Sequence, residues 1–222
     1  MPLIQRIQEN ELTYGIWKVS ETVDDLLSKF GDRQSFYASQ LEQFRYEGRR
    51  LEWLAVRALL KEMLGEECEI GYKESGKPYL INSKWNVSIS HTRGYVTVAL
   101  SLSRIIGIDI EQYGNRVCKI AKRFIREDEN CSVENARLQD PLLENRDNMV
   151  YAMLLHWSAK ESIFKIMEQI DVDFLHNLQI YPFNLCIDGS FKGKEYGSPE
   201  RKEFLIRYLL HPDFVLTYAI NE

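Results

Sequence analysis

The chain lacks the features that mark membrane, zinc-binding and disulfide-rich proteins. Among 222 residues there are four widely spaced cysteines and no C-x-x-C pair, which argues against a zinc site and favours reduced thiols. No apolar run approaches the ~20 residues that a membrane span needs, and the start has no signal-peptide core. The net charge of -5 disfavours nucleic acid as a partner. We therefore expect a cytoplasmic, globular protein that needs neither membrane nor nucleic acid.

Hydrophobic periodicity predicts a mixture of strands and helices. The length of 222 residues is enough for one large domain or two small ones, and the hydrophobic fraction of 45% is typical of a globular protein. Glycine at position 65 should end the second helix, a turn is expected at Asp188-Gly189-Ser190, and the polar stretch from Cys131 to Asp147 reads as irregular. The predicted helices are 21–30, 47–64, 117–125 and 148–167, and the predicted strands are 12–19, 69–73, 79–81, 85–90, 95–102, 105–111, 178–187, 203–210 and 214–220.

The stretch Ile106-Gly107-Ile108-Asp109-Ile110-Glu111 carries two acids in an otherwise apolar strand. Because side chains alternate along a strand, Asp109 and Glu111 point to one face and the three isoleucines to the other. Carboxylates on an apolar strand are costly unless a positive group pairs with them, and Mg²⁺ is one such partner. An edge strand whose acids face water explains the stretch equally well. These residues alone leave both interpretations open.

Two long helical segments resemble each other when they are aligned 104 positions apart. Leu51, Trp53, Ala55 and Lys61 match Leu155, Trp157, Ala159 and Lys165, whereas Arg57 falls opposite Glu161. Each segment is followed by β-rich sequence. This pattern predicts an α+β fold of two similar α/β halves, 1–108 and 109–222, related by a pseudo-twofold axis, each with a long helix packed on a mainly antiparallel sheet. Such a chain could function as a monomer.

The second long helix has an unusual polar face. Trp157, Glu161 and Lys165 are spaced i, i+4 and i+8, opposite the apolar residues of the same helix. A tryptophan there is better explained by a face that meets the other half of the chain than by exposure to water. The alternative is an exposed amphipathic helix with an ordinary Glu–Lys pair.

Four motifs together resemble those of the Sfp-like 4′-phosphopantetheinyl transferases. Gly107 to Glu111 is similar to G-x-D-x-E, and Trp157 to Lys165 is similar to W-x-x-K-E-[SA]-x-x-K. Gly76-Lys77-Pro78 and Ser88 to His91 are similar to G-K-P and S-x-S-H. The motifs occur in the family's order and span residues 76 to 165.

The resemblance implies that the protein moves the phosphopantetheine arm of coenzyme A onto a serine of an apo acyl, peptidyl or polyketide carrier, releasing 3′,5′-ADP. It implies that Asp109, Glu111 and Glu161 hold Mg²⁺ against the pyrophosphate. Glu161 is also a candidate base, and Lys165 could stabilise the phosphates. The strand would then lie at the seam between the halves, with the first half on the nucleotide side and the second half providing the metal-binding helix and the carrier side.

The resemblance also implies contacts with the substrates. The residues expected at CoA are Lys77, Ser90, His91, Lys160 and Lys165, with Arg50 as the candidate from the first long helix and Arg57 as its alternative. A basic segment after Glu111 could attract the acidic helix of a carrier protein through Lys119, Lys122, Arg123 and Phe124. That segment could instead be a solvated helix with Phe124 in the core.

Two other functions remain open on these residues. A Mg²⁺-dependent phosphohydrolase could use the same acids on a nucleotide, and it would release phosphate without a carrier protein. A non-catalytic CoA- or carrier-binding module would bind CoA without turnover. The complete set of three carboxylates argues against the binding module.

Overall fold

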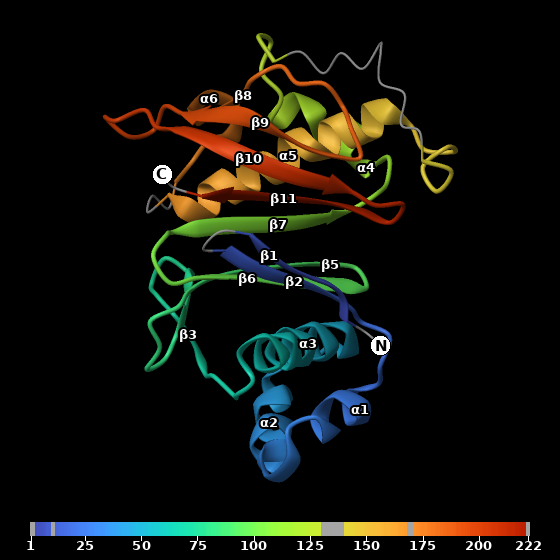
Figure 1. Ribbon diagram of the computed structural model, residues 1–222, viewed down its shortest axis with the longest axis vertical. Coiled ribbons are helices and arrows are strands. Elements are labelled where there is room, and N and C mark those ends of the chain that lie inside the picture. The colour runs from blue at the N-terminus through green and yellow to red at the C-terminus, as the bar shows by residue number, and fades with distance from the viewer. Residues whose placement is uncertain (1–2, 10–11, 130–139, 168–170, 221–222) are drawn as a thin grey trace. The chain divides into compact units, whose positions relative to one another are not determined.

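The structure is a computed structural model that describes residues 3–9, 12–129, 140–167 and 171–220 (Figure 1). The chain divides into two compact units, Met1–Ser103 and Arg104–Glu222, here called unit 1 and unit 2. The expected division after residue 108 falls within the first strand of unit 2.

Unit 1 is an antiparallel sheet with one long helix on a face. The sheet order is β1-β2-β6-β5, and α3 (Glu47–Leu64) covers one face (Figure 1). The strands are β1 (Leu3–Glu9), β2 (Leu12–Lys18), β5 (Asn86–Thr92) and β6 (Tyr95–Ser101). A hairpin of β3 (Ile70–Tyr72) and β4 (Pro78–Leu80), two short helices, α1 (Val23–Ser28) and α2 (Gln34–Gln40), and the 3-10 turns Gly31–Arg33 and Leu41–Gln43 complete the unit.

The core of unit 1 forms where α3 meets the sheet. The helix buries Leu54, Ala55, Ala58 and Leu59, at the spacing of one helical face, against β2 and β6. Gly65 ends the helix with φ +76°, a left-handed conformation that glycine adopts without a steric cost. The predicted end of this helix is therefore confirmed.

Unit 2 has a five-stranded antiparallel sheet in the order β7-β11-β10-β9-β8, with α5 (Asn148–Ile166) against β7 and β11. The strands are β7 (Ile106–Gln112), β8 (Leu178–Ile180), β9 (Asp188–Glu195), β10 (Glu203–Leu210) and β11 (Phe214–Ile220). Two short helices, α4 (Arg116–Ile120) and α6 (Phe174–Asn177), and a 3-10 turn, Ala121–Arg123, complete the unit. Asp147 caps α5 by accepting a hydrogen bond from the Met149 amide.

The predicted α+β class is confirmed, and both units place a long helix on an antiparallel sheet. The pseudo-twofold axis stays a prediction. No helix in the described ranges is long and apolar enough to cross a membrane. Cys68, Cys118 and Cys186 are free thiols, whereas Cys131 and most of the stretch expected to be irregular lie outside the described residues.

Several element predictions were wrong in detail. The predicted turn at Asp188-Gly189-Ser190 begins β9, where Ser190 and Asp188 pair with Arg207 and Leu209 of β10. The predicted strand 178–187 is confined to β8. The predicted helix 117–125 breaks after Ile120, and Phe124 turns inward to the core. Strand β1 was not predicted, because its sequence is largely polar.

Candidate functional site

The two segments singled out in unit 2 pack closely because of a glycine. Gly107 of β7 lies directly under α5, and a Cβ there would overlap the carbonyl group of Ser162. The obstacle is backbone rather than a flexible side chain, so a larger residue would push the helix and strand apart. The glycine of the G-x-D-x-E motif therefore sets how close α5 comes to the neighbouring acids.

Buried hydroxyl groups hold α5 beside Asp109. The Oγ atoms of Ser158 and Ser162 lie 2.9 and 2.7 Å from Thr217 Oγ1, and Ser162 Oγ also donates to the Thr217 carbonyl at 3.1 Å. Thr217 is the partner of Asp109 in the pairing of β11 with β7. The three hydroxyls are fully buried, so their mutual hydrogen bonds offset the cost of removing them from water. Sequence reasoning missed them because Ser and Thr are common in helices and strands.

Strand alternation turns Gly107, Asp109 and Glu111 toward α5. Asp109 is only 4% exposed, and its Oδ1 accepts a hydrogen bond from Lys165 Nζ at 2.7 Å. The same ammonium donates to the Ile108 carbonyl at 2.8 Å. Trp157 Nε1 donates to Glu111 Oε1 at 2.7 Å. The polar face of the helix was expected to meet the other half of the chain, but Trp157 and Lys165 instead contact the acidic face of a strand in their own unit.

The carboxyl groups of this site are close together and poorly solvated. Burial raises the pKa of Glu111 to about 7, and the negative charge of Asp109 contributes. Burial likewise raises the pKa of Glu161 to about 7, again with a contribution from Asp109, while Lys165 opposes the shift. Three carboxyl groups thus share one nearby ammonium. A further cation would relieve their repulsion.

The acidic side chains suit Mg²⁺ by their chemistry, since oxygen ligands are what this ion prefers. Within the described ranges, no three or more His, Cys, Asp or Glu side chains are grouped so that they could hold a metal ion together. Mg²⁺ is usually bound through one or two carboxylates, waters and substrate phosphates, so it does not require three protein ligands. Any protein ligands here would come from Asp109, Glu111 and Glu161.

Lys160 and Phe124, which were expected at the substrates, are instead fully buried. Lys160 has no exposed side-chain surface, and its ammonium donates to Glu129 and to two backbone carbonyls. Its burial leaves no surface for CoA. Phe124 is also fully buried, so its ring is not part of a carrier-binding surface. In contrast, Lys119, Lys122 and Arg123 are exposed.

In unit 1, the basic residue next to His91 is Arg49 rather than Arg50. Arg49 Nη1 lies 2.6 Å from His91 Nε2, and both residues contact Glu52, at 3.2 and 3.4 Å. Arg50 is half-buried and donates to the Phe44 carbonyl at 2.9 Å. The available signal for Arg49 was its i, i+3 spacing from Glu52, which places both on one face of α3.

Arg57, the alternative candidate, is used inside unit 1. Its guanidinium lies 3.4 Å from the centroid of the Trp53 ring and donates to the Trp53 carbonyl. Burial lowers the pKa of Arg57 to about 10. The alternation of β5 puts Ser90, which is buried, on the face opposite His91, and Lys77 is half-buried next to the left-handed Gly76.

Comparison with known proteins identifies a family for the half of the chain that holds this site. Residues 105–219 match the model of the 4′-phosphopantetheinyl transferase superfamily, which is slightly more than half of the chain. The match begins just before β7 and ends within β11. No curated protein matches the chain. The matched range contains Asp109, Glu111, Glu161 and Lys165.

Proposed function

Because the chain belongs to the 4′-phosphopantetheinyl transferase superfamily, we propose that it moves the 4′-phosphopantetheine arm of coenzyme A to a serine of an apo carrier protein. The acceptor would be an acyl carrier protein or a peptidyl or polyketide carrier domain, and 3′,5′-ADP would be released. The observation that carries the proposal is the meeting of Asp109, Glu111 and Glu161 with Lys165 where α5 packs on β7.

The side chains have separate roles in this proposal. The serine oxygen forms a bond to the phosphorus next to the pantetheine arm, and the bond from that phosphorus to the oxygen of 3′,5′-ADP breaks. Glu161 accepts the serine proton, and its raised pKa of about 7 suits a base at neutral pH. Lys165 places a positive charge beside the acids, where it can stabilise the departing phosphate. Bound Mg²⁺ would polarise the pyrophosphate.

The substrate contacts are assigned to exposed basic residues. In unit 1 we assign the nucleotide phosphates of CoA to His91 and Arg49. The half-buried Lys77 is a further candidate, and Ser90 is a weaker one because it is buried on the face opposite His91. Arg50 and Arg57 remain weaker candidates, because protein groups already hold their guanidiniums. In unit 2, the exposed Lys119, Lys122 and Arg123 suit an acidic carrier surface.

Intact-mass spectrometry tests the function directly. Several apo carrier proteins are each incubated with this protein, CoA and Mg²⁺, and a transferred arm makes the carrier about 340 Da heavier. Carrier mass that stays constant for every acceptor, together with phosphate release from CoA alone, would identify a phosphohydrolase. CoA binding without any mass change or phosphate release would identify a binding module.

The site assignment has its own control. Asp109→Ala should abolish transfer while circular dichroism shows the fold intact, because removing this carboxylate takes away a proposed ligand and the partner of Lys165. Normal transfer by this variant would refute the assignment, whatever the activity of the unchanged protein.

A further inference from the structure

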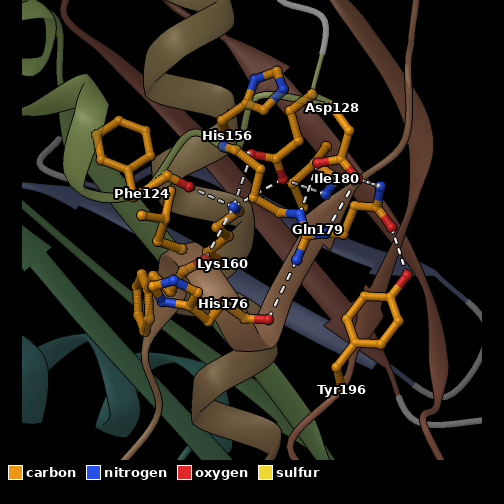
Figure 2. Close-up of polar contacts among 12 residues, drawn as sticks. Phe124, Asp128, His156, Lys160, His176, Gln179, Ile180 and Tyr196 are labelled. Atoms are coloured by element: carbon orange, nitrogen blue, oxygen red, sulfur yellow. Dashed lines mark hydrogen bonds and ion pairs between the residues drawn. The ribbon is translucent and has the colours of Figure 1, made fainter.

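Lys160 lies next to Glu161 in the chain, yet it points into the core of unit 2 (Figure 2). Its Nζ donates to the carbonyl of Phe124, to Glu129 Oε2 at 2.9 Å and to the carbonyl of Phe174 at 3.1 Å. An ammonium has three protons, so these three acceptors satisfy it completely. The lysine of the helix motif is thus fully occupied by protein groups.

The partner carboxylate is equally well surrounded. The side chain of Glu129 has no exposed surface, and its two oxygens accept hydrogen bonds from the amides of Arg126, at 2.8 Å, and Ile180, at 2.6 Å. One ion pair therefore joins α5, the segment 124–129, α6 and β8. Next to this ion pair, Asp128 accepts hydrogen bonds from the guanidinium of Arg126 and from the side-chain amide of Gln179 (Figure 2).

Stability alone does not explain such a pair. Taking two charges out of water is costly, and apolar side chains of similar volume in place of a buried ion pair are often as stable or more so. Its hydrogen bonds are directional, however, whereas apolar contacts are not. The pair is therefore suited to fixing the position of the segments that it joins.

The joined segments lead back to the acidic site through Trp157. The two carbonyls held by Lys160 belong to Phe124 and Phe174, and the rings of these residues flank the Trp157 ring at centroid distances of 5.2 and 5.3 Å. Trp157 Nε1 in turn donates to Glu111. A displacement of either phenylalanine would therefore shift Trp157, and through its hydrogen bond the Glu111 carboxylate.

We propose that the buried Lys160–Glu129 pair is a positioning device, which fixes Phe124 and Phe174 around Trp157 and thereby orients the Glu111 carboxylate. Lys160 is then a positioning residue rather than a contact for CoA. The inference rests on the proposed function for its catalytic consequence. Its structural part, the coupling of the ion pair to Trp157, stands independently of any activity.

Nuclear magnetic resonance of the indole N–H groups tests the coupling without substrate. The chain has four tryptophans, so a ¹⁵N-labelled sample gives four indole signals, and Trp157→Phe identifies that of Trp157. We expect Lys160→Met and Glu129→Gln to move the Trp157 signal away from its hydrogen-bonded position. Leu210→Ala, which shortens a buried side chain of β10 in the same core, is the matched control and should leave that signal in place.

The double variant Lys160→Met/Glu129→Leu keeps the test decisive if single variants unfold, because it leaves no unpaired buried charge. We expect it to fold, to move the Trp157 signal, and to require about 10–100-fold more Mg²⁺ for half-maximal transfer, as is usual when groups supporting a metal ligand are lost. Its KM for CoA should change less than about twofold, since a positioning role spares uniform substrate binding.

Two results would overturn the inference. One is a folded double variant whose Trp157 signal and Mg²⁺ requirement both equal those of the unchanged protein. The other is an unmoved signal with a greatly raised KM for CoA, which would make Lys160 a CoA contact. If the unchanged protein transfers nothing, the proposed function fails, while the Trp157 signal still decides whether the ion pair controls that side chain.

Discussion

The long helices α3 and α5 carry the same spacing of tryptophan, charged residue and lysine, but their side chains do different work. In α3 the charges are satisfied within the packing of unit 1. Arg57 stacks on Trp53, and Lys61 donates to the Lys29 carbonyl at 2.8 Å and to Glu67 at 3.0 Å. Contact of a guanidinium with an aromatic ring and an ion pair near the surface both stabilise the fold. The charged groups that make these contacts are therefore not available for catalysis.

In α5 the matching positions assemble a charged site. Glu161 replaces the arginine, and the neighbouring strand contributes Asp109 and Glu111, which the lysine and tryptophan contact. The pKa values of Glu111 and Glu161 are raised chiefly by burial, and the negative charge of Asp109 adds to the shift. The two helices thus differ mainly at one position, where α3 has the cation Arg57 and α5 has the anion Glu161. Because Glu161 lies beside two acids of a strand, α5 forms part of the candidate site, whereas α3 supports the packing of unit 1.

Substitutions in the two helices should differ most in their effect on transfer activity. Glu161→Gln should lower the transfer rate about 10²–10⁴-fold, since it would remove the proposed base at nearly constant volume. Lys61→Met, at the position of α3 that matches Lys165, should leave transfer unchanged. The measurement is the initial rate of carrier modification by intact mass, and equal rates for Glu161→Gln and the unchanged protein would break the comparison.

The glycines beneath the two helices should differ in stability. A Cβ on Gly107 meets the Ser162 backbone, whereas a Cβ on Gly15 of β2 meets the flexible ends of Leu59 and Met63. We expect Gly107→Ala to cost about 3 kcal/mol of unfolding free energy and Gly15→Ala about 1 kcal/mol, in the range of overpacked cores. Urea unfolding of both variants measures this, and a larger loss for Gly15→Ala would contradict it.

Substitutions of Trp157 and Trp53 should differ in their effect on the Mg²⁺ concentration that transfer requires. Trp157→Phe keeps an aromatic ring between Phe124 and Phe174 but removes the donor to Glu111, and we expect the Mg²⁺ requirement of transfer to rise about tenfold. Trp53→Phe should not change it, because Trp53 packs in the core of unit 1. A titration of transfer rate against Mg²⁺ distinguishes the two, and a shared shift would argue for a general packing effect.

The smallest effect concerns pH and a buried histidine of α5. Burial lowers the pKa of His156 below its usual 6.5, with Lys160 also opposing and Glu129 favouring the charged form. The unfolded chain therefore binds a proton that the folded chain does not, so stability from this group is present above pH 6.5 and is lost as pH falls toward the lowered pKa. The loss should be at most about 1.4 kcal/mol per pH unit.

Unfolding free energies measured between pH 5 and 8 test this titration. His156→Leu removes the titrating ring, which packs near the ring of Phe183 and is hydrogen-bonded to the Ala152 carbonyl, and should flatten the decline below pH 6.5. Identical pH profiles for the variant and the unchanged protein would assign the decline to other groups.

The sequence was sufficient for patterns that repeat along one element. Alternation in β7 grouped Asp109 with Glu111, helical spacing grouped Trp157 with Glu161 and Lys165, and the structure brings the two groups together. It was insufficient where a side chain's direction depends on distant segments. Lys160 was expected at CoA and not in the core, because its partner Glu129 is 31 positions away and no local pattern reveals such a pair. Arg49 was missed in favour of Arg50 because neighbouring positions on a helix differ by 100° in direction.

The pairing of β7 with β11 has a consequence for synthesis of the chain. Thr217, opposite Asp109, follows it by more than a hundred residues, so β7 and its glycine-bearing face emerge well before their partner strand. At a synthesis rate of about 5–20 residues per second, the Ile106–Ile110 stretch would be exposed for several seconds before β11 is made. Charges on a strand of this kind discourage pairing with other chains. Asp109 and Glu111, proposed metal ligands in the folded protein, would thus also protect the nascent chain from aggregation.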